Sequence, residues 1–244
     1  MNRTDIKRKI AEVRALMNTE ATPFDDNSPG ARKERLRRSG TEDGYFARTY
    51  LPHYFNRPSP GFHKEIYAFA RVEDEPVFLA APREHAKSTI VSFETPLEDI
   101  CLERKHFIIL ISDTEGLAAD FSVFIMLELE ENERIKADFG DLKGRQWKAE
   151  DFVTRNGIRV KARGRGQRMR GLRNRQYRPD RVIIDDLEND KNVRNPKLVK
   201  ETVTWILTTV MGSLERNFSM MMIGTILAKN SVLSWFINAK DEGG

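Results

Sequence analysis

The chain has 244 residues, a net charge of +4 and a single cysteine, Cys101. This length suits one α/β domain with a sizeable core. One cysteine excludes an intrachain disulfide, and no Cys/His cluster suggests zinc, so we expect a reducing, intracellular setting. Residues 1–10 lack the apolar core of a secretory signal, and no apolar run reaches about 18 residues. We therefore expect a soluble protein that is neither secreted nor inserted in a membrane.

Residues 1–44 form a polar stretch that differs from the remainder of the chain. Residues 22–30 are rich in turn-forming side chains, and residues 31–38 could form a basic helix, although the sequence shows nothing that would bury it. We expect a small N-terminal helical subdomain or mobile segment over residues 1–44, followed by one domain over residues 45–244.

Residues 62–70 have the apolar spacing of a helix. An aromatic stripe at this spacing is more often part of a core than of a ligand site, so we expect Tyr67 and Phe69 to be buried. The apolar run at residues 77–80 then predicts a short buried strand.

The polar loop APREHAKST (residues 81–89) follows that strand and opens an amphipathic stretch. Strand, loop, Lys-Ser and helix are the parts of a phosphate-binding P-loop, in which Lys87 would reach the β/γ-phosphates and Ser88 would ligate Mg²⁺. Ala81 and Ala86 stand where the motif has glycine, and alanine at positive φ costs roughly 1 kcal/mol. The alternative is that Lys87 only begins a solvated helix. In either case we expect its side chain to face a solvent cleft.

Three more apolar runs predict buried strands that end in polar pairs: residues 106–112 before Asp113-Thr114, 181–184 before Asp185-Asp186, and 218–223 before Gly224-Thr225. Helical patterns run from residue 115 to about 134, and from Asn195-Pro196, an N-cap with a first-turn proline, to about 214. Such alternation implies an α/β fold with a mainly parallel central sheet and helices on both faces. Ligands bind beyond the carboxyl ends of the strands in these folds, so the polar pairs should share that edge with the loop at residues 81–89.

Residues 155–181 contain ten arginines and one lysine but a single acid, Asp180. Residues 158–162 alternate like a half-buried strand, and residues 163–179 form a loop rich in glycine and arginine. Because arginine favours bidentate phosphate contacts, we expect a basic surface for a polyanion. The alternative is an ordinary solvated charged face.

The run VIIDD (residues 182–186) has the form of a strand that places one carboxylate beside Mg²⁺ and a second beside an attacking water. With Lys87 and Ser88 on a neighbouring strand, Asp185 and Asp186 would complete the parts that nucleotide hydrolysis needs. The alternative is that the two acids only end a strand in a turn.

Four segments, in this order and spacing, resemble the ATPase domain of the large terminase subunit of tailed bacteriophages: APREHAKST, ISDTEGLAADF, RGRGQRMRGLRNRQYRPDRVIIDDLEND and MMMIGT. The resemblance covers roughly residues 45–240. It implies a P-loop NTPase fold and an ATPase that uses ATP and Mg²⁺ to drive double-stranded DNA into a procapsid. Such a motor works in the host cytoplasm during virion assembly, as a ring of copies of itself with a portal protein and a small terminase subunit. The family's nuclease domain would follow Gly244, and we expect that the chain is truncated before it.

The resemblance implies a nucleotide site built from Ala81, Pro82, Arg83, Glu84, His85, Ala86, Lys87, Ser88 and Thr89. Within this loop, Arg83 resembles an arginine linked to hydrolysis. His63 stands where related motors have a glutamine that reads adenine, and the alternative is a histidine packed within its helix.

The resemblance also implies roles at the strand ends. Ser88 and Asp185 would hold Mg²⁺, and Thr225 would be the coupling residue that senses hydrolysis. Asp186 stands where the family usually has glutamate as the catalytic base, and Glu188 is the alternative because its side chain has the longer reach.

Arg170 resembles the arginine that a neighbouring subunit inserts in trans, with Arg173 or Arg175 as alternatives. Two other functions remain open. The chain could be a different nucleic-acid translocase, such as a helicase-like ATPase, or a DNA-binding module whose degenerate P-loop does not hydrolyse nucleotide.

Overall fold

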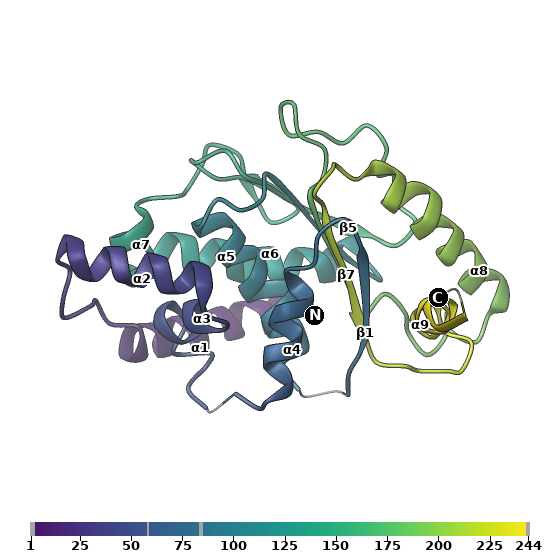
Figure 1. Ribbon diagram of the computed structural model, residues 1–244, viewed down its shortest axis with the longest axis horizontal. Helices are drawn as coiled ribbons and strands as arrows, with labels where there is room; N and C mark the ends of the chain where they lie inside the picture. Colours follow the sequence, from purple (N-terminus) through teal and green to yellow (C-terminus); the bar gives the residue numbers. More distant parts are fainter. Residues whose placement is uncertain (1–2, 58, 83–84, 243–244) are drawn as a thin grey trace.

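The computed structural model describes residues 3–57, 59–82 and 85–242. Strands within these ranges form a seven-stranded sheet in the order β1-β7-β6-β2-β5-β4-β3 (Figure 1). The strands are β1 (Pro76–Ala80), β2 (Phe107–Ser112), β3 (Trp147–Lys148), β4 (Asp151–Val153), β5 (Arg159–Gly164), β6 (Arg181–Asp185) and β7 (Ser219–Gly224). The five strands from β1 to β5 in this order are parallel, and the β4 and β3 pairings are antiparallel. The predicted α/β class with a mainly parallel sheet is confirmed.

Helices cover both faces of this sheet. They are α1 (Arg3–Glu20), α2 (Pro29–Thr41), α3 (Tyr45–Tyr50), α4 (Phe62–Ala70), α5 (Thr95–Cys101), α6 (Glu115–Glu131), α7 (Glu133–Phe139), α8 (Pro196–Trp205) and α9 (Val232–Glu242). In Figure 1, α1 to α7 lie on one side of the sheet, and α8 and α9 lie on the other. No helix within the described ranges is long and apolar enough to cross a membrane.

Two hydrophobic cores result, one on each face of the sheet, and strand β2 contributes to both. Ile108 and Leu110 belong to the core under α4, α5 and α6, whereas Ile109 and Ile111 belong to the core under α8 and α9. Successive side chains of a strand point to opposite faces, so a strand that is covered on both sides must be apolar throughout. This is why residues 106–112 read as a continuous apolar run.

Strand β7 lies between β1 and β6 and pairs with both of them. The prediction that the strand before the Lys87 loop is a neighbour of the strand before Asp185 is therefore wrong. Every residue of β7 is buried, and its three methionines fit both cores because methionine adapts to irregular packing. Because β7 lies between β1 and β6, its last residue, Gly224, lies between the loop that follows β1 and the loop that follows β6.

The helix after β1 is widened in its first turns. It begins at Lys87, passes through a π-helical segment η1 (Thr89–Glu94), and continues as α5. Pro96 has no N–H to donate to the carbonyl of Ser92, four residues earlier, and the amide of Thr95 donates to Ile90, five residues earlier. A proline that removes one bond of the ladder is a recognised cause of such a distortion.

Helices α1 and α2 contact the rest of the molecule through ion pairs. Arg14 donates to the carboxylate of Glu131 in α6 at 2.8 Å. Arg35 of α2 is buried, and its guanidinium donates two hydrogen bonds to Asp138 at 2.7 and 2.8 Å. The hydroxyl of Tyr50 donates to the same carboxylate at 2.6 Å. The basic helix predicted at residues 31–38 is confirmed, and acids more than 100 residues away supply the partner that its sequence does not show.

Several predicted elements differ in detail. The single helix predicted from residue 115 to about 134 is two helices, because Asn132 caps α7 by accepting hydrogen bonds from two of its amides. The helix that begins at Asn195-Pro196 is α-helical to Trp205 and then continues as a π-helical segment η2 (Ile206–Val210) and a 3₁₀ turn η3 (Met211–Ser213). Tyr67 is buried as expected, but the expectation for Phe69 is wrong, since it is 40% exposed on the outer side of α4.

Candidate functional site

Polar side chains from separate strands meet at the carboxyl edge of the sheet. The hydroxyl of Ser88, after β1, donates to Asp185 at the end of β6 (3.1 Å). The hydroxyl of Ser112, the last residue of β2, donates to the backbone carbonyl of Asp185 (2.9 Å). Thr225, directly after β7, donates to the carbonyl of Ala81 (3.3 Å). The ends of four strands are thus joined around Asp185.

Asp185 is the most buried acid of this edge, with 3% of its surface exposed. Its second carboxylate oxygen accepts a hydrogen bond from Ser92 at 2.6 Å. Burial raises the pKa of Asp185 to about 6, with a smaller contribution from the negative charge of Asp186, while the serine hydroxyls and the charge of Lys87 oppose the rise. A carboxyl group with this pKa is still mainly ionised at neutral pH.

Ser92 is a site residue that the sequence analysis did not single out. It lies four residues after Ser88, and side chains at this spacing share one face of a helix. The spacing between the two serines was therefore a usable signal, once the helix was known to point that face at Asp185.

Lys87 is buried, with only 6% of its surface exposed, so the expectation of a side chain facing a solvent cleft is wrong. It lies close enough to Asp185 for its positive charge to lower the pKa of that carboxyl. The residue before it, Ala86, has φ = 55°, in the left-handed region that glycine tolerates best. Ala81 has no such conformation. Of the two alanines that replace glycines of the motif, only Ala86 adopts a backbone conformation that favours glycine.

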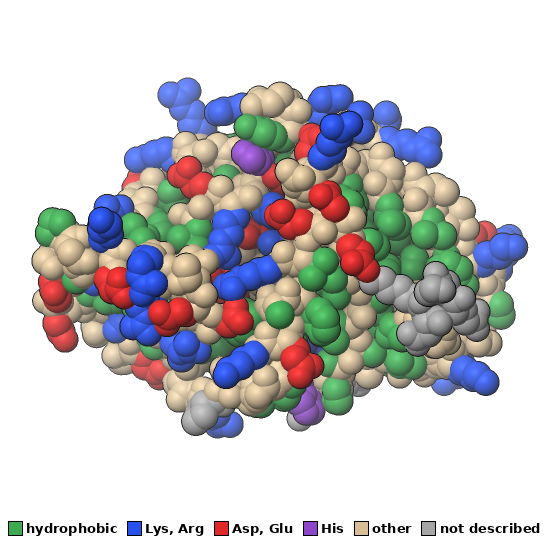
Figure 2. Space-filling view, viewed as in Figure 1, with side chains coloured by type: hydrophobic (Ala, Val, Ile, Leu, Met, Phe, Trp, Pro, Cys, Tyr) green, Lys and Arg blue, Asp and Glu red, His purple; other side chains and the backbone are tan. Residues whose placement is uncertain are grey.

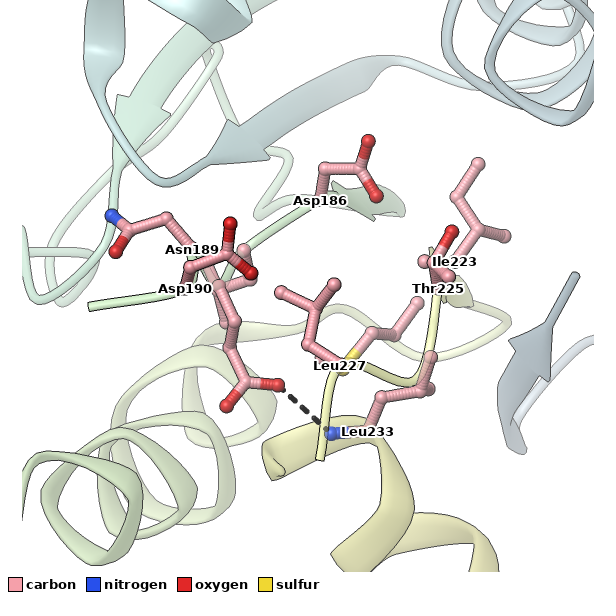
Figure 3. Close-up of a pocket in the computed structure, with 11 residues that line it drawn as sticks. Asp186, Asn189, Asp190, Ile223, Thr225, Leu227 and Leu233 are labelled. Atoms are coloured by element: carbon pink, nitrogen blue, oxygen red, sulfur yellow. Dashed lines mark hydrogen bonds between the residues drawn. The ribbon is translucent and has the colours of Figure 1, made fainter. Parts of the chain in front are cut away.

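Asp186 is exposed and adopts φ = 42°, an uncommon value for a residue with a side chain. Its amide donates to the carbonyl of Ile223, which fixes the turn against the end of β7 (3.2 Å). Asp186 and Thr225 line a cavity of about 170 Å³ (Figure 3). In that view the Asp186 carboxylate points away from Leu233 and the start of α9.

Glu188 lines the same cavity, but its carboxylate is engaged by α9. Its two oxygens accept hydrogen bonds from the amide of Val232, the first residue of that helix, at 2.8 and 2.9 Å. A carboxylate at a helix N-terminus satisfies amides that have no partner within the helix and complements the helix dipole. Burial nevertheless raises the pKa of Glu188. Asp186 and Glu188 are thus close in sequence, but only Asp186 is exposed.

His63 of α4 contacts the loop after β1. Its Nε2 atom lies 3.2 Å from the carbonyl oxygen of His85, so this nitrogen carries the proton and donates. Its Nδ1 atom is buried and has no hydrogen-bond partner among the described residues. Arg83 and Glu84, which the resemblance also assigns to this loop, lie outside the described residues.

The basic stretch at residues 155–181 divides into two groups. Six of its eleven cations pair with acids: Arg155 with Asp141, Arg159 and Lys161 with Asp151, Arg163 with Glu115, Arg165 with Asp113, and Arg181 with Asp99. The free charge of this stretch is therefore smaller than its sequence predicts, because acids on other elements neutralise about half of it. The other five are exposed: Arg168, Arg170, Arg173, Arg175 and Arg178. Figure 2 shows Lys and Arg side chains along the top of the view, where the loop after β5 rises in Figure 1.

A second cavity, of about 330 Å³, lies beside Ser88, Asp185 and Asp186. Hydroxyl and carboxylate oxygens are the ligands that Mg²⁺ prefers, and this ion is usually held by one or two carboxylates together with water and phosphate oxygens. The residues present fit such an ion. Within the described ranges, no group of three or more His, Cys, Asp or Glu side chains could hold a metal ion. A cation here would take its remaining ligands from water or from a substrate.

No family model matches the chain, and no curated protein matches it.

Proposed function

We propose that the chain is a P-loop ATPase that hydrolyses ATP to move double-stranded DNA, as its resemblance to the large terminase subunit implies. The observation that supports this most is the hydrogen bond between Ser88 and Asp185, two residues 97 positions apart in the chain. They are the residues to which the motif assigns the metal, and they come from different strands. The carboxyl ends of parallel strands share one edge of the sheet, and here that edge brings together two side chains to which the motif assigns the same metal.

The chain's own residues would divide the work as follows. Lys87 neutralises the charge of the phosphates, and Ser88 and Asp185 hold the metal. A bound Mg²⁺ would neutralise the charge that develops on the transferred phosphoryl group. Residues 81–89 are here called the phosphate loop. Thr225 donates to the carbonyl of Ala81, so a shift of this loop would displace the end of β7.

Asp186 is our proposed base, because it is exposed beside Asp185 while Glu188 is bonded to α9. A base must lie within about 2.6–3.2 Å of the water from which it takes a proton. For Glu188 to do so, it would have to release the amide of Val232 and leave the start of α9 without its partner.

The DNA partner is proposed from the five exposed arginines at residues 168–178. Contacts to phosphates release counterions and carry little sequence information, so binding would be sequence-independent and salt-sensitive. Arg170 would act in trans on a neighbouring copy in a ring. The portal protein, the small terminase subunit and the host cytoplasm are proposed on the resemblance alone.

His63 would brace the phosphate loop through the carbonyl of His85, whether or not it also reads the base. Its hydrogen bond to the loop supports the bracing role.

The test is ATP turnover by Lys87→Met and Lys87→Ala, with Lys105→Met as the matched control. Both lysines are buried, but Lys105 lies before β2, at the opposite edge of the sheet, where it pairs with Glu73. Methionine retains most of the side-chain volume, so the two methionine variants lose mainly a charge. We expect phosphate release to disappear in both Lys87 variants and to persist per folded molecule in Lys105→Met, with folding monitored by thermal unfolding.

Unchanged turnover in Lys87→Met would reject the ATPase site. A wild-type chain that binds DNA but releases no phosphate with ATP, Mg²⁺ and DNA present would instead support the DNA-binding module.

A further inference from the structure

Asp113, directly after β2, links two loops that are otherwise separate. One carboxylate oxygen accepts a hydrogen bond from the side chain of Asn189 at 2.7 Å. The other accepts one from Asn192 at 3.2 Å and lies 3.3 Å from the guanidinium of Arg165. The Asp113 and Arg165 side chains are only 17% and 21% exposed, so this contact is partly shielded from solvent. Ion pairs in such positions are screened less than surface pairs.

The first loop, residues 165–180, is here called the arginine loop, and it carries the five exposed arginines. Its beginning is fixed to β2, because the amide of Arg165 donates to the carbonyl of Ser112 at 3.0 Å. Two residues further on it is fixed to α8, because the indole of Trp205 donates to the carbonyl of Gln167 at 3.1 Å. The charged tips are therefore exposed on a loop whose anchoring points lie against the sheet and α8.

The second loop, residues 186–193, is here called the Asp186 loop. The side chain of Asn189 accepts hydrogen bonds from the amides of Lys191 and Asn192, both at 3.0 Å, which organises the turn. Leu187 is buried in the core under α8 and α9, and Val193 is also buried. Each asparagine that reaches Asp113 therefore also belongs to the segment that carries Asp186.

Arg165 influences the Asp186 loop at a second point. Its positive charge opposes the rise in the pKa of Glu188 that burial causes, so the guanidinium lies near that carboxylate as well. By contrast, Arg163 pairs with Glu115 at the start of α6. Arg165 thus shares the Asp113 carboxylate with the two asparagines of the Asp186 loop.

We propose that Asp113 is a positioning residue that couples DNA binding on the arginine loop to the placement of Asp186. The inference rests on the proposed function. Arg165 can pair either with Asp113 or with a phosphate of the DNA backbone, since a guanidinium binds carboxylate and phosphate anions alike. When DNA draws Arg165 away, Asp113 retains only its two asparagine donors and the Asp186 loop shifts relative to β2. This is a two-state contact that both sites bias, as coupling requires.

The first arm of the test measures ATP turnover with and without a short DNA duplex. Asp113→Ala removes the link, and Asp141→Ala is the matched control, because Asp141 also pairs with an arginine of the basic stretch (Arg155, 2.6 Å) but at an exposed position before β3. Coupling between two sites typically amounts to about 5- to 150-fold. We expect Asp113→Ala to keep its basal turnover and its DNA affinity but to lose at least about fivefold of the stimulation by DNA. Asp141→Ala should be stimulated like the wild type.

The second arm does not depend on turnover. Hydrogen exchange of a peptide covering residues 186–193 is measured with and without the duplex, in the absence of nucleotide. DNA should change its protection in the wild type and in Asp141→Ala, but not in Asp113→Ala. If Asp113→Ala does not fold, the double variant Asn189→Ala/Asn192→Ala replaces it, because it breaks the same link from the other side.

An Asp113→Ala protein that keeps both the stimulation and the exchange response would overturn the inference. So would a wild-type protein in which DNA binds without altering exchange at residues 186–193. A wild type that shows the exchange response but never hydrolyses ATP would reject the proposed ATPase activity and leave the link supported.

Discussion

Strand β6 has a buried acid at each end, and the two acids are held in opposite ways. Asp180, just before the strand, is 6% exposed, and Asp185, its last residue, is 3% exposed. Asp180 accepts hydrogen bonds from the backbone amides of His106 (3.0 and 2.8 Å) and Phe107 (2.7 Å). Asp185 accepts its side-chain hydrogen bonds from two serine hydroxyls.

The difference separates a structural acid from one that can change partners. Backbone amides are fixed by the sheet, so the carboxylate of Asp180 fixes the start of β2 to the start of β6. A hydroxyl can rotate and become an acceptor, so Ser88 and Ser92 could release the carboxylate of Asp185 to a cation without any backbone movement. Burial without fixed donors is also what raises the pKa of Asp185 to about 6. Perturbed acids of this kind are concentrated at functional sites.

The largest effect is expected for Asp185→Asn. The amide keeps the shape of the side chain and can still bond to both serines, but it removes the charge that would hold the metal. We expect ATP turnover to fall by at least about 10³-fold, since removal of one preorganised electrostatic group already costs about 10²–10³. Steady-state phosphate release at saturating Mg²⁺ measures this. Turnover within tenfold of the wild type would show that Asp185 is not a metal ligand.

The pH dependence of stability gives a second way to separate the two acids. The pKa of Asp185 is raised from 3.8 to about 6, so the folded state binds its proton more tightly than the unfolded state does. Its contribution is therefore fully present below about pH 4 and is lost as pH rises to about 6 and beyond, a change of about 3 kcal/mol. Asp185→Asn should lack this loss and be more stable than the wild type above pH 7 in the absence of nucleotide. Urea unfolding at pH 4.5 and 7.5 measures it, and parallel pH profiles of the two proteins would contradict it.

Asp180→Asn should behave in the opposite way. Its amide group would turn a donor toward one of the backbone N–H groups of His106 or Phe107, which leaves a buried donor without a partner. We expect a loss of about 1–3 kcal/mol in the free energy of unfolding, with turnover per folded molecule retained. Urea unfolding combined with active-site titration of the folded fraction distinguishes the two quantities. If Asp180→Asn lost turnover while its stability was unchanged, Asp180 would not be the purely structural acid described here.

The smallest effect is expected for glycine substitutions at Ala81 and Ala86, in the loop after β1. Ala86 has φ = 55°, whereas Ala81, at the other glycine position of the motif, has no positive φ. Ala86→Gly should stabilise the protein by up to about 1 kcal/mol, and Ala81→Gly should destabilise it by roughly 0.5–1 kcal/mol, because glycine only adds unfolded-state freedom there. Differential scanning calorimetry of the two variants suffices, and the same sign in both would contradict the backbone assignment.

Much of the fold could be predicted because its strands are covered on both faces. The strands at residues 77–80, 106–112, 181–184 and 218–223 were predicted from short apolar runs, and each run coincides with a strand. β3 and β4, with two and three residues, are too short to produce a periodic signal. The order of β1, β7 and β6 could not be predicted either, because pairing between parallel strands depends on contacts across the whole chain.

The sequence predicted which residues form the candidate site, but it did not predict how buried they are or which acids their neighbours pair with. The motif identified Ser88 and Asp185, which the structure joins. It could not show that Lys87 is buried, because the burial depends on elements remote in sequence. Nor could it show that Arg165 and Arg181 are paired, since Asp113 and Asp99 lie more than 50 residues earlier. Charge runs can be judged only when the acids of the neighbouring strands are known.

The contact between Thr225 and Ala81 joins residues 144 positions apart in the chain, and β1 pairs with β7 alone among the described strands. Long-range pairing of this kind is slow to form, because the entropy of closing the intervening chain is lost before any contact compensates for it. During synthesis, β1 must wait for β7 to leave the ribosome, while β2, β5 and β6 can already pair. We therefore expect the loop after β1 to acquire its final shape last, so that the proposed nucleotide binding reports completed folding and a nascent chain shorter than about residue 225 binds none.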